Sequence, residues 1–586
     1  MNSKSTKSPH SDMNTRDRRF SFIIGAVLSA SLAFLIIRAP YGWCFNDEPF
    51  IVTLAQRLYM GDCMILDEWH PAQTFGPVVL PFYYVFRLFC PDNTGILLAF
   101  RYTYCVLWWT TCFAVFCVIK KQFRCTFIAL GVFSYLVLFS PLDYMTLSYT
   151  SIGLMSCLLL SCLILEAATR PSKIIFAFSA LFSLCTVILI LCSPYMAGVY
   201  FLVLIMAFFK QKNTVPSEEK NCIQMVRWSG FCSFFFFLVI LLGLVVRKGE
   251  DWKTYIECIQ MVLSDPAHPN TRIIKRFIEC LSAIVNKNWM YSALIGVSIG
   301  CSFYRKGFRK IRLTLFCICV CGYLYAVYSY LCDNVYVKFN QQMIDIALLG
   351  LVAFALLEEK PWELFLSFTV TGLIYTFMNY LASNTGIYSI GMTLSVCGVG
   401  SIVYIVKLCQ ELRRQYPGKK RLRFLISLIC VGIMVTQLSS ELLTRVFRQY
   451  WDEEPAALTE TIQVGAAKGL KTTLERKEEY ELQYEELKTL LNCVTEKEEN
   501  RFVCITASPV TYLDADMRFG TFSAWSFSYQ DNYMDYLKKY EMITHHSEER
   551  VFYISRQDDL PDSFPIEHYQ MLKAGNSALF VPSDIF

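Results

Sequence analysis

Residues 20–49 read FSFIIGAVLSASLAFLIIRAPYGWCFNDEP, and this stretch contains the two features that decide the fold. Its first part, residues 20–38, is apolar and has close to the roughly 20 residues that a helix needs to cross a bilayer. Its last part places Asp47 and Glu48 shortly beyond that run. Carboxylates so close to a membrane are costly unless they face water, a partner or a substrate. The stretch therefore predicts a membrane helix followed by a functional segment.

The composition of the whole chain indicates a polytopic membrane protein. Of its 586 residues, 54% are hydrophobic and only 18% are charged, whereas soluble domains carry roughly 25% charged residues. The formal net charge of +5 is small for this length. We therefore expect membrane lipids to be partners of this protein and nucleic acid not to be one.

The 25 cysteines lie mostly inside apolar runs, where cysteine behaves as a small buried hydrophobe. No Cys-x-x-Cys pair or Cys/His cluster has the spacing of a zinc site. We expect no metal site and no cofactor, although the sequence leaves a divalent-cation requirement open. The polar N-terminus lacks a small-residue cleavage site, so we do not expect a cleaved signal peptide.

Apolar runs long enough to be membrane helices recur along the first three quarters of the chain. About thirteen are found, near residues 20–38, 96–119, 125–140, 150–167, 173–192, 196–210, 229–246, 289–304, 312–331, 341–357, 362–381, 387–407 and 422–441.

Basic residues predict the orientation of these helices, because Lys and Arg stay on the cytoplasmic side. With the N-terminal tail inside, every second connection should be basic. Five of these six connections are basic, and only the turn at residues 358–360 fits poorly. We expect a cytoplasmic tail over residues 1–19, a membrane domain over 20–444 and a multi-pass topology in the plasma membrane.

The remaining segments face outward in this topology. The first outer loop, residues 39–95, contains two apolar helical stretches, at 50–59 and 75–89, that are expected at the membrane interface. From residue 445 the composition becomes charged, and Val503 to Thr506 resembles a strand. About 140 residues suffice for a small soluble domain. We predict a small extracytoplasmic α/β domain over residues 445–586.

The outer loop has the residue types for chemistry on a lipid-linked donor. Asp47 can serve as a base at the start of a helix, with Glu48 beside it. A phosphate leaving group needs cationic or hydrogen-bonding partners, and Arg101 and His70 are the candidates. Five further residues could line the site, and Lys338 is the weakest candidate among them. They are Asp67, Glu68, Asp143, Tyr144 and Lys338.

The segment over about residues 20–165 resembles the GT-C glycosyltransferases, in the branch of the dolichyl-phosphate-mannose–protein mannosyltransferases and the lipid A aminoarabinose transferases. The Asp47-Glu48 pair and the run Asp67-Glu68-Trp69-His70-Pro71 carry the resemblance, with Ala72 in place of the family's second proline. The resemblance implies that Asp47 is the catalytic base and that Glu48 is the adjacent acidic residue. It also implies that Arg101 contacts the donor phosphate and that the fold is GT-C-like.

The expected activity is transfer of a sugar from a polyprenyl-phosphate donor, with inversion, to a protein, glycan or glycolipid acceptor in the cell envelope. As alternatives to these site roles, Asp47 and Glu48 could simply form a solvated helix start, and Arg101 could anchor its helix at the membrane surface. A lipid or glycan transporter (a flippase) is the rival function. A non-catalytic scaffold whose tail binds a partner is the third.

Overall fold

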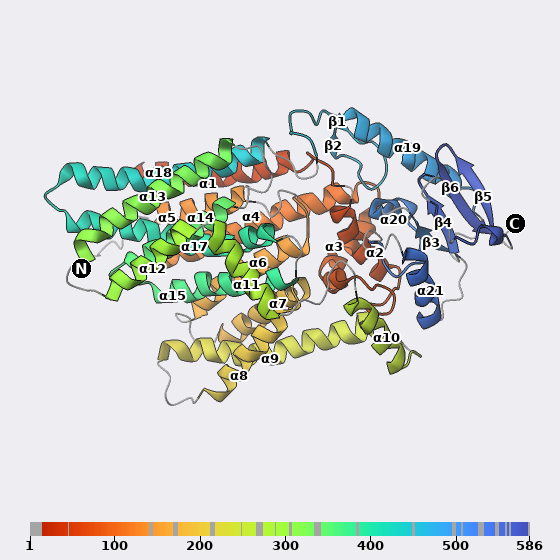
Figure 1. Cartoon of the computed structure of the whole chain (residues 1–586), viewed down its shortest axis with the longest axis horizontal. Helices are drawn as coiled ribbons and strands as arrows, with labels where there is room; N and C mark the ends of the chain where they lie inside the picture. The colour runs from red at the N-terminus through yellow and green to blue at the C-terminus, as the bar shows by residue number, and fades with distance from the viewer. Residues whose placement is uncertain are drawn as a thin grey trace, which may run out of the picture.

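The computed structural model describes most of the chain. The described residues are 15–44, 46–139, 145–167, 174–210, 217–247, 249–264, 273–287, 289–303, 308–332, 341–382, 386–447, 452–494, 500–505, 508–525, 532–544, 550–556, 560–561 and 564–583. Helices make up 75% of the structure. A long helical bundle occupies one end, and a small sheet lies at the other, near the C-terminus (Figure 1).

Eight helices within the described residues are long and apolar enough to cross a membrane. They are α4 (Ile96–Phe123), α6 (Tyr149–Ala167), α7 (Ile175–Cys192), α9 (Ser217–Ile240) with η5 (Leu241–Val245), α13 (Phe308–Cys332), α15 (Trp362–Leu364) with η7 (Phe365–Val370) and α16 (Thr371–Ala382), α17 (Ile387–Gln415) and α18 (Lys420–Phe447).

Helices with shorter apolar stretches complete the bundle. Four of them are α1 (Thr15–Arg38, with its apolar part at Phe22–Arg38), α5 (Thr126–Leu138), α8 (Met196–Phe209) and α14 (Gln341–Leu356), and the short helix α12 (Trp289–Phe303) joins them. A helix therefore covers each of the thirteen apolar runs of the sequence. Two further helices, α10 (Trp252–Leu263) and α11 (Ile273–Lys287), are amphipathic.

Helix α17 is the centre of the bundle, and its apolar stretch is buried throughout. Small residues let its neighbours approach closely, as is common between membrane helices. A Cβ atom at Gly350 of α14 would overlap Ser401 of α17, and one at Gly398 would overlap Tyr135 of α5. These glycines allow α14 and α5 to pack directly against α17.

The C-terminal region is a mixed α/β unit. Its elements are β1 (Glu460–Thr461), β2 (Lys471–Thr472), α19 (Leu474–Leu491), β3 (Arg501–Cys504), α20 (Pro509–Ala515), α21 (Tyr533–Thr544), β4 (Arg550–Ile554), η10 (Ile566–His568), β5 (Tyr569–Ala574) and β6 (Ser577–Pro582). Strands β3, β4, β6 and β5 form the main sheet in that order, with β3 parallel to β4 and the other pairs antiparallel. The strand predicted at Val503 is confirmed as β3.

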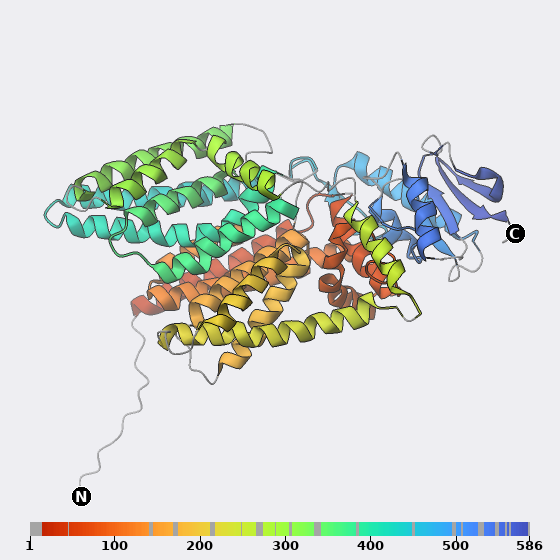
Figure 2. The same cartoon turned by 60° about the horizontal axis from the view of Figure 1, so that its bottom comes forward.

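The first connection lies between the bundle and this C-terminal unit (Figure 2). It contains α2 (Asp47–Tyr59), η1 (Pro71–Phe75) and α3 (Gly76–Phe89). Phe50 and Leu54 of α2 share an apolar core with residues of α19, α20 and the sheet. Protein therefore covers α2, whereas α3 leaves Leu88 and Phe89 exposed. The first connection and the C-terminal unit are folded together.

Candidate active site

Asp47 is the first residue of α2 and is half-buried. The free backbone N–H groups at a helix N-terminus favour a negative charge. Its carboxylate lies near Tyr149, the first residue of α6, with which it interacts electrostatically. Tyr149 is 36% exposed. Burial raises the pKa of the neighbouring Cys44 thiol to about 12, and the charges of Asp47 and Glu48 add to this effect. The negatively charged carboxylate of Asp47 is thus partly accessible to solvent.

Glu48 points into the protein, away from this accessible face. Its two carboxylate oxygens accept hydrogen bonds from Nε and Nη2 of Arg101 at 2.7 and 2.6 Å. Both side chains are almost completely buried. Arg101 also donates from Nη1 to the backbone oxygens of Ala39 (2.9 Å) and Tyr41 (3.2 Å). The pair therefore ties α2 to α4 and to the end of α1.

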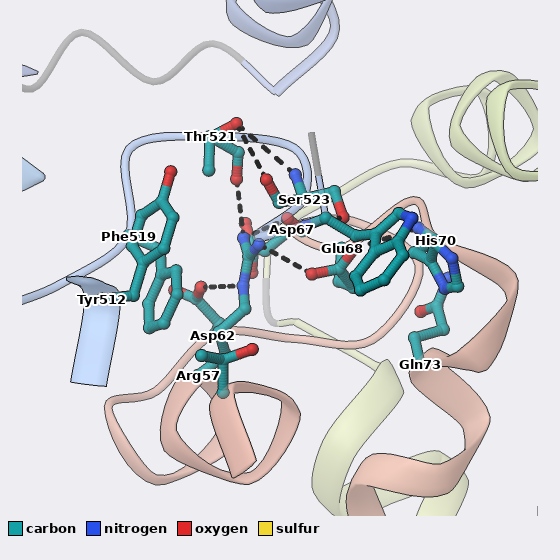
Figure 3. Close-up of polar contacts among 12 residues, drawn as sticks. Arg57, Asp62, Asp67, Glu68, His70, Gln73, Tyr512, Phe519, Thr521 and Ser523 are labelled. Atoms are coloured by element: carbon teal, nitrogen blue, oxygen red, sulfur yellow. Dashed lines mark hydrogen bonds and ion pairs between the residues drawn. The ribbon is translucent and has the colours of Figure 1, made fainter. Parts of the chain in front are cut away.

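A second buried cluster surrounds Arg57, the cation of α2 (Figure 3). Its Nε donates to Asp62 and its Nη1 to Glu68, each at 2.9 Å. Its Nη2 donates to the backbone oxygens of Asp67 and Thr521, the latter at 2.8 Å. Thr521 belongs to the C-terminal unit, so this arginine joins the first connection to that unit.

Burial changes the pKa of acidic residues in this cluster. It raises the pKa of both Asp62 and Glu68, although the charge of Arg57 opposes the effect. Asp67 is buried as well, and its carboxylate accepts hydrogen bonds from Arg247 and from the hydroxyl of Tyr540. These carboxylates hold structure together through compensated charge, as buried ions must.

His70 begins the short helix η1. Its ring Nδ1 accepts a hydrogen bond from the backbone N–H of Ala72 (3.1 Å), and the backbone N–H of His70 donates to the Glu68 carboxylate (2.9 Å). The ring packs edge-on against Phe50, with ring centres 4.8 Å apart. A proline at position 72 has no N–H and would lose the first bond. The backbone N–H of Ala72 therefore has a structural role, at the position where the GT-C family that the sequence resembles has its second proline.

The predicted residues thus fall into three groups. Asp47 is half-buried, Glu48 and Arg101 form a buried pair, and a third group surrounds Arg57. That group contains Asp67, Glu68 and His70. Three further predicted residues, Asp143, Tyr144 and Lys338, lie outside the described residues.

Several residues of the third group were not predicted. Arg57, Arg247 and Tyr540 belong to it, and Thr521 contributes a carbonyl. Asp62, a carboxylate expected near the membrane but not assigned to the site, belongs to it as well. The one local signal was a lone arginine within the apolar face of α2. Such a residue demands buried counter-charges, and Asp62 and Glu68, further along the same connection, supply them.

Among the described residues, no group of three or more His, Cys, Asp or Glu side chains is placed to hold a metal ion. The first connection thus contains the half-buried Asp47 beside two buried charge clusters, the Glu48–Arg101 pair and the group around Arg57. No family model and no curated protein matches this chain.

Proposed function

We propose that this protein is a GT-C-type membrane glycosyltransferase that moves a sugar from a polyprenyl-phosphate donor to an acceptor at the outer face. The observation that carries the proposal is the placement of Asp47. It is half-buried at the N-terminus of α2, while its neighbour Glu48 is neutralised by Arg101. Asp47 would take the proton of the acceptor hydroxyl as that oxygen attacks the sugar carbon from the face opposite the phosphate, inverting it.

The proposed topology has thirteen membrane helices, an N-terminus in the cytoplasm and the C-terminal unit outside the plasma membrane. Helices cover all thirteen apolar runs, and the alternation of basic connections supports their orientation. The first connection and the C-terminal sheet lie at the same end of the bundle (Figure 1). This arrangement would place Asp47 where a lipid-borne donor and a water-soluble acceptor can meet.

The donor-phosphate roles of Arg101 and His70 stay predictions. Arg101 is engaged by Glu48 and by two backbone oxygens, so a phosphate would have to replace the Glu48 carboxylate. His70 donates and accepts within the first connection. We expect Arg101 to act mainly by positioning the N-terminus of α2, and therefore Asp47.

The test is transfer by purified Asp47→Asn protein in lipid nanodiscs. Radiolabelled polyprenyl-phosphate hexoses and pentoses serve as donors, and cell-envelope extract supplies the acceptors. Loss of a general base lowers rates by about 10²–10⁴-fold, so transfer should fall by at least about 100-fold. Asp92→Asn is the matched control, because Asp92 is an exposed aspartate of the same connection. Near-normal transfer by the Asp47 variant would falsify the proposal.

The rival function, transport of a lipid or glycan, has a specific observation in its favour. Asp345 of α14 and Glu441 of α18 are buried within apolar helices. Gln437 donates to Glu441 (2.6 Å) and accepts from Tyr323 of α13 (2.6 Å). Ionisable groups inside membrane helices commonly mark transport pathways. Translocation of a labelled lipid that stops in Asp345→Asn or Glu441→Gln, without sugar transfer by the wild type, would favour this function.

A further inference from the structure

A hollow of about 430 Å³ lies at the turn between α17 and α18. Its lining consists of Gln410, Arg413, Arg414, Pro417 and Arg423. Both views place this turn at the end of the bundle opposite the C-terminal sheet (Figures 1 and 2). It is therefore remote from Asp47 and from both charge clusters described above.

The three arginines of this hollow have no carboxylate partner within the described residues. Arg423 donates weakly to the Pro417 carbonyl (3.4 Å), and its enclosed Nε has no hydrogen-bond partner in that part of the chain. Glu411, the acidic residue of α17 closest in sequence to Arg413, is already used, because Arg312 binds both Glu411 (2.6 Å) and Glu358 (2.9 Å). The hollow thus presents several N–H donors and an uncompensated positive charge.

Guanidinium groups match the oxygen geometry of phosphate better than any other side chain. Paired N–H donors can bind two phosphate oxygens at once. A hollow with three such groups and no internal anion is therefore suited to a phosphate ester, and a neutral ligand would leave the charge uncompensated.

The surface beside the hollow indicates which phosphate ester would bind. Directly after Arg423, α18 exposes Phe424 (71%), Leu425 (49%) and Leu428 (54%). An apolar surface next to a basic hollow fits a molecule with a phosphate headgroup and hydrocarbon chains. Basic residues at the cytoplasmic ends of membrane helices also meet the anionic lipids of that leaflet.

We propose that this hollow binds the phosphate of an anionic phospholipid in the inner leaflet, with its acyl chains along α18. The phosphate would lie among Arg413, Arg414 and Arg423 and compensate their charge. This inference rests on the proposed topology, which puts this end of the bundle at the inner leaflet, but not on the proposed sugar transfer.

The test measures lipid binding to the full-length protein in detergent by native mass spectrometry, with phosphatidylglycerol and phosphatidylcholine as probes. The wild type should bind one phosphatidylglycerol at least about tenfold more tightly than phosphatidylcholine, given about 1 kcal/mol for each basic residue near an anionic surface. The combined variant Arg413→Gln, Arg414→Gln, Arg423→Gln should reduce this preference to below about twofold.

The matched control removes three positive charges from the same turn. Lys419, Lys420 and Arg421 are exposed and do not line the hollow, so their combined change to Gln should keep the preference. Equal losses in the two triple variants would mean diffuse attraction and overturn the proposal. If the first triple variant does not fold, Arg414→Gln alone should weaken phosphatidylglycerol binding at least about threefold, and an unchanged affinity would overturn the proposal.

Inorganic phosphate distinguishes the lipid from a free anion. Sodium phosphate at millimolar concentration should neither raise the melting temperature of the lipid-free protein nor displace bound phosphatidylglycerol. Stabilisation by phosphate alone that equals the effect of the lipid, and that the first triple variant abolishes, would assign the hollow to a soluble phosphate and overturn the lipid proposal.

Discussion

Arg101 and Glu48 form a two-point ion pair that is sealed inside the protein at the junction of α2 and α4, with Nε–Oε1 and Nη2–Oε2 distances of 2.7 and 2.6 Å. Consecutive residues of a helix point about 100° apart. Glu48 is therefore buried, while the Asp47 side chain is only half-buried. The pair fixes the start of α2 and, with it, the direction of the Asp47 side chain.

Removing one member of this pair should destabilise the protein strongly. Glu48→Gln leaves the Arg101 charge buried without a counter-charge, which costs about 3–5 kcal/mol when one partner of a buried ion pair is lost. The double variant Glu48→Gln, Arg101→Gln should recover much of that loss, because two neutral amides can bond to each other. Intrinsic fluorescence during thermal unfolding measures these two variants and the single variant Arg101→Gln. Additive losses in the double variant would show that the two side chains act independently.

Arg57 should control how firmly the first connection is held to the C-terminal unit. Arg57→Met leaves the buried Glu68 without its cation, leaves Asp62 with only the longer contact to Arg501 (3.7 Å), and removes the bond to the Thr521 carbonyl. Hydrogen exchange over residues 60–75 should become at least about tenfold faster, the equivalent of 1.4 kcal/mol in local opening. Arg57→Lys keeps the charge but cannot serve all four acceptors, so intermediate exchange is expected. Unchanged exchange in the Met variant would contradict the role of this cluster.

Asp514 predicts a pH dependence of stability in the C-terminal unit. Burial raises the pKa of this carboxyl from 3.8 to about 7, against hydrogen bonds from the Ala466 N–H and the Tyr480 hydroxyl that lower it. The folded protein therefore binds this proton more tightly than the unfolded chain. Stability from this group is greatest below about pH 4, falls as the pH rises towards 7 and is constant above that. The whole change is on the order of 4 kcal/mol.

Asp514→Asn should remove this part of the pH dependence. The variant keeps an oxygen acceptor for Ala466, so we expect it to melt above the wild type at pH 8 and close to it at pH 4–5. Asp516→Asn is an opposite control, because it breaks the ion pair with Arg87 (2.8 Å) and should melt below the wild type at pH 8. A wild-type melting temperature that does not decrease relative to Asp514→Asn between pH 5 and pH 8 would contradict the raised pKa.

The helices of the bundle were predictable because their signal is local. An apolar run of about 20 residues has few stable alternatives to a helix in a membrane, and a helix occupies each predicted run. Strand β3 was predictable for a similar reason, since Val503 and its neighbours form a short β-branched and apolar run. In each case the residues that give the pattern also form the element.

The surroundings of α2 were not predictable in this way. Phe50 and Leu54 give the same helical spacing whether lipid or protein covers them, and here residues more than 400 positions away cover them. Likewise, Glu68 next to a membrane indicates a functional carboxylate until Arg57 is placed beside it. Arg101 was a phosphate candidate because an arginine suits a phosphate and a carboxylate equally well. The roles of these side chains depend on partners that are distant in the sequence, and the spacing of residues along the chain does not identify those partners.

This packing changes what a truncation can reveal about the C-terminal unit. Deleting residues 445–586 removes the Thr521 carbonyl and the apolar residues that bury Phe50 and Leu54. We therefore expect the deletion to abolish sugar transfer even if the C-terminal unit has no activity of its own. Limited proteolysis should then cut the first connection within residues 46–75, which the full-length protein protects. Protection that persists in the truncated protein would mean that the connection folds without its cover.

A scaffold and a transferase are separated better by changing the edge strand β5 of the C-terminal unit. Gln570, Met571 and Lys573 of β5 are exposed and remote from α2. Their combined change to Ala should leave the melting temperature close to that of the wild type and sugar transfer within about twofold of it, since a surface substitution usually alters stability by no more than about 0.5 kcal/mol. A scaffold that binds its partner through this strand would lose co-purification of that partner. Loss of transfer with an unchanged melting temperature would instead place an acceptor contact on β5.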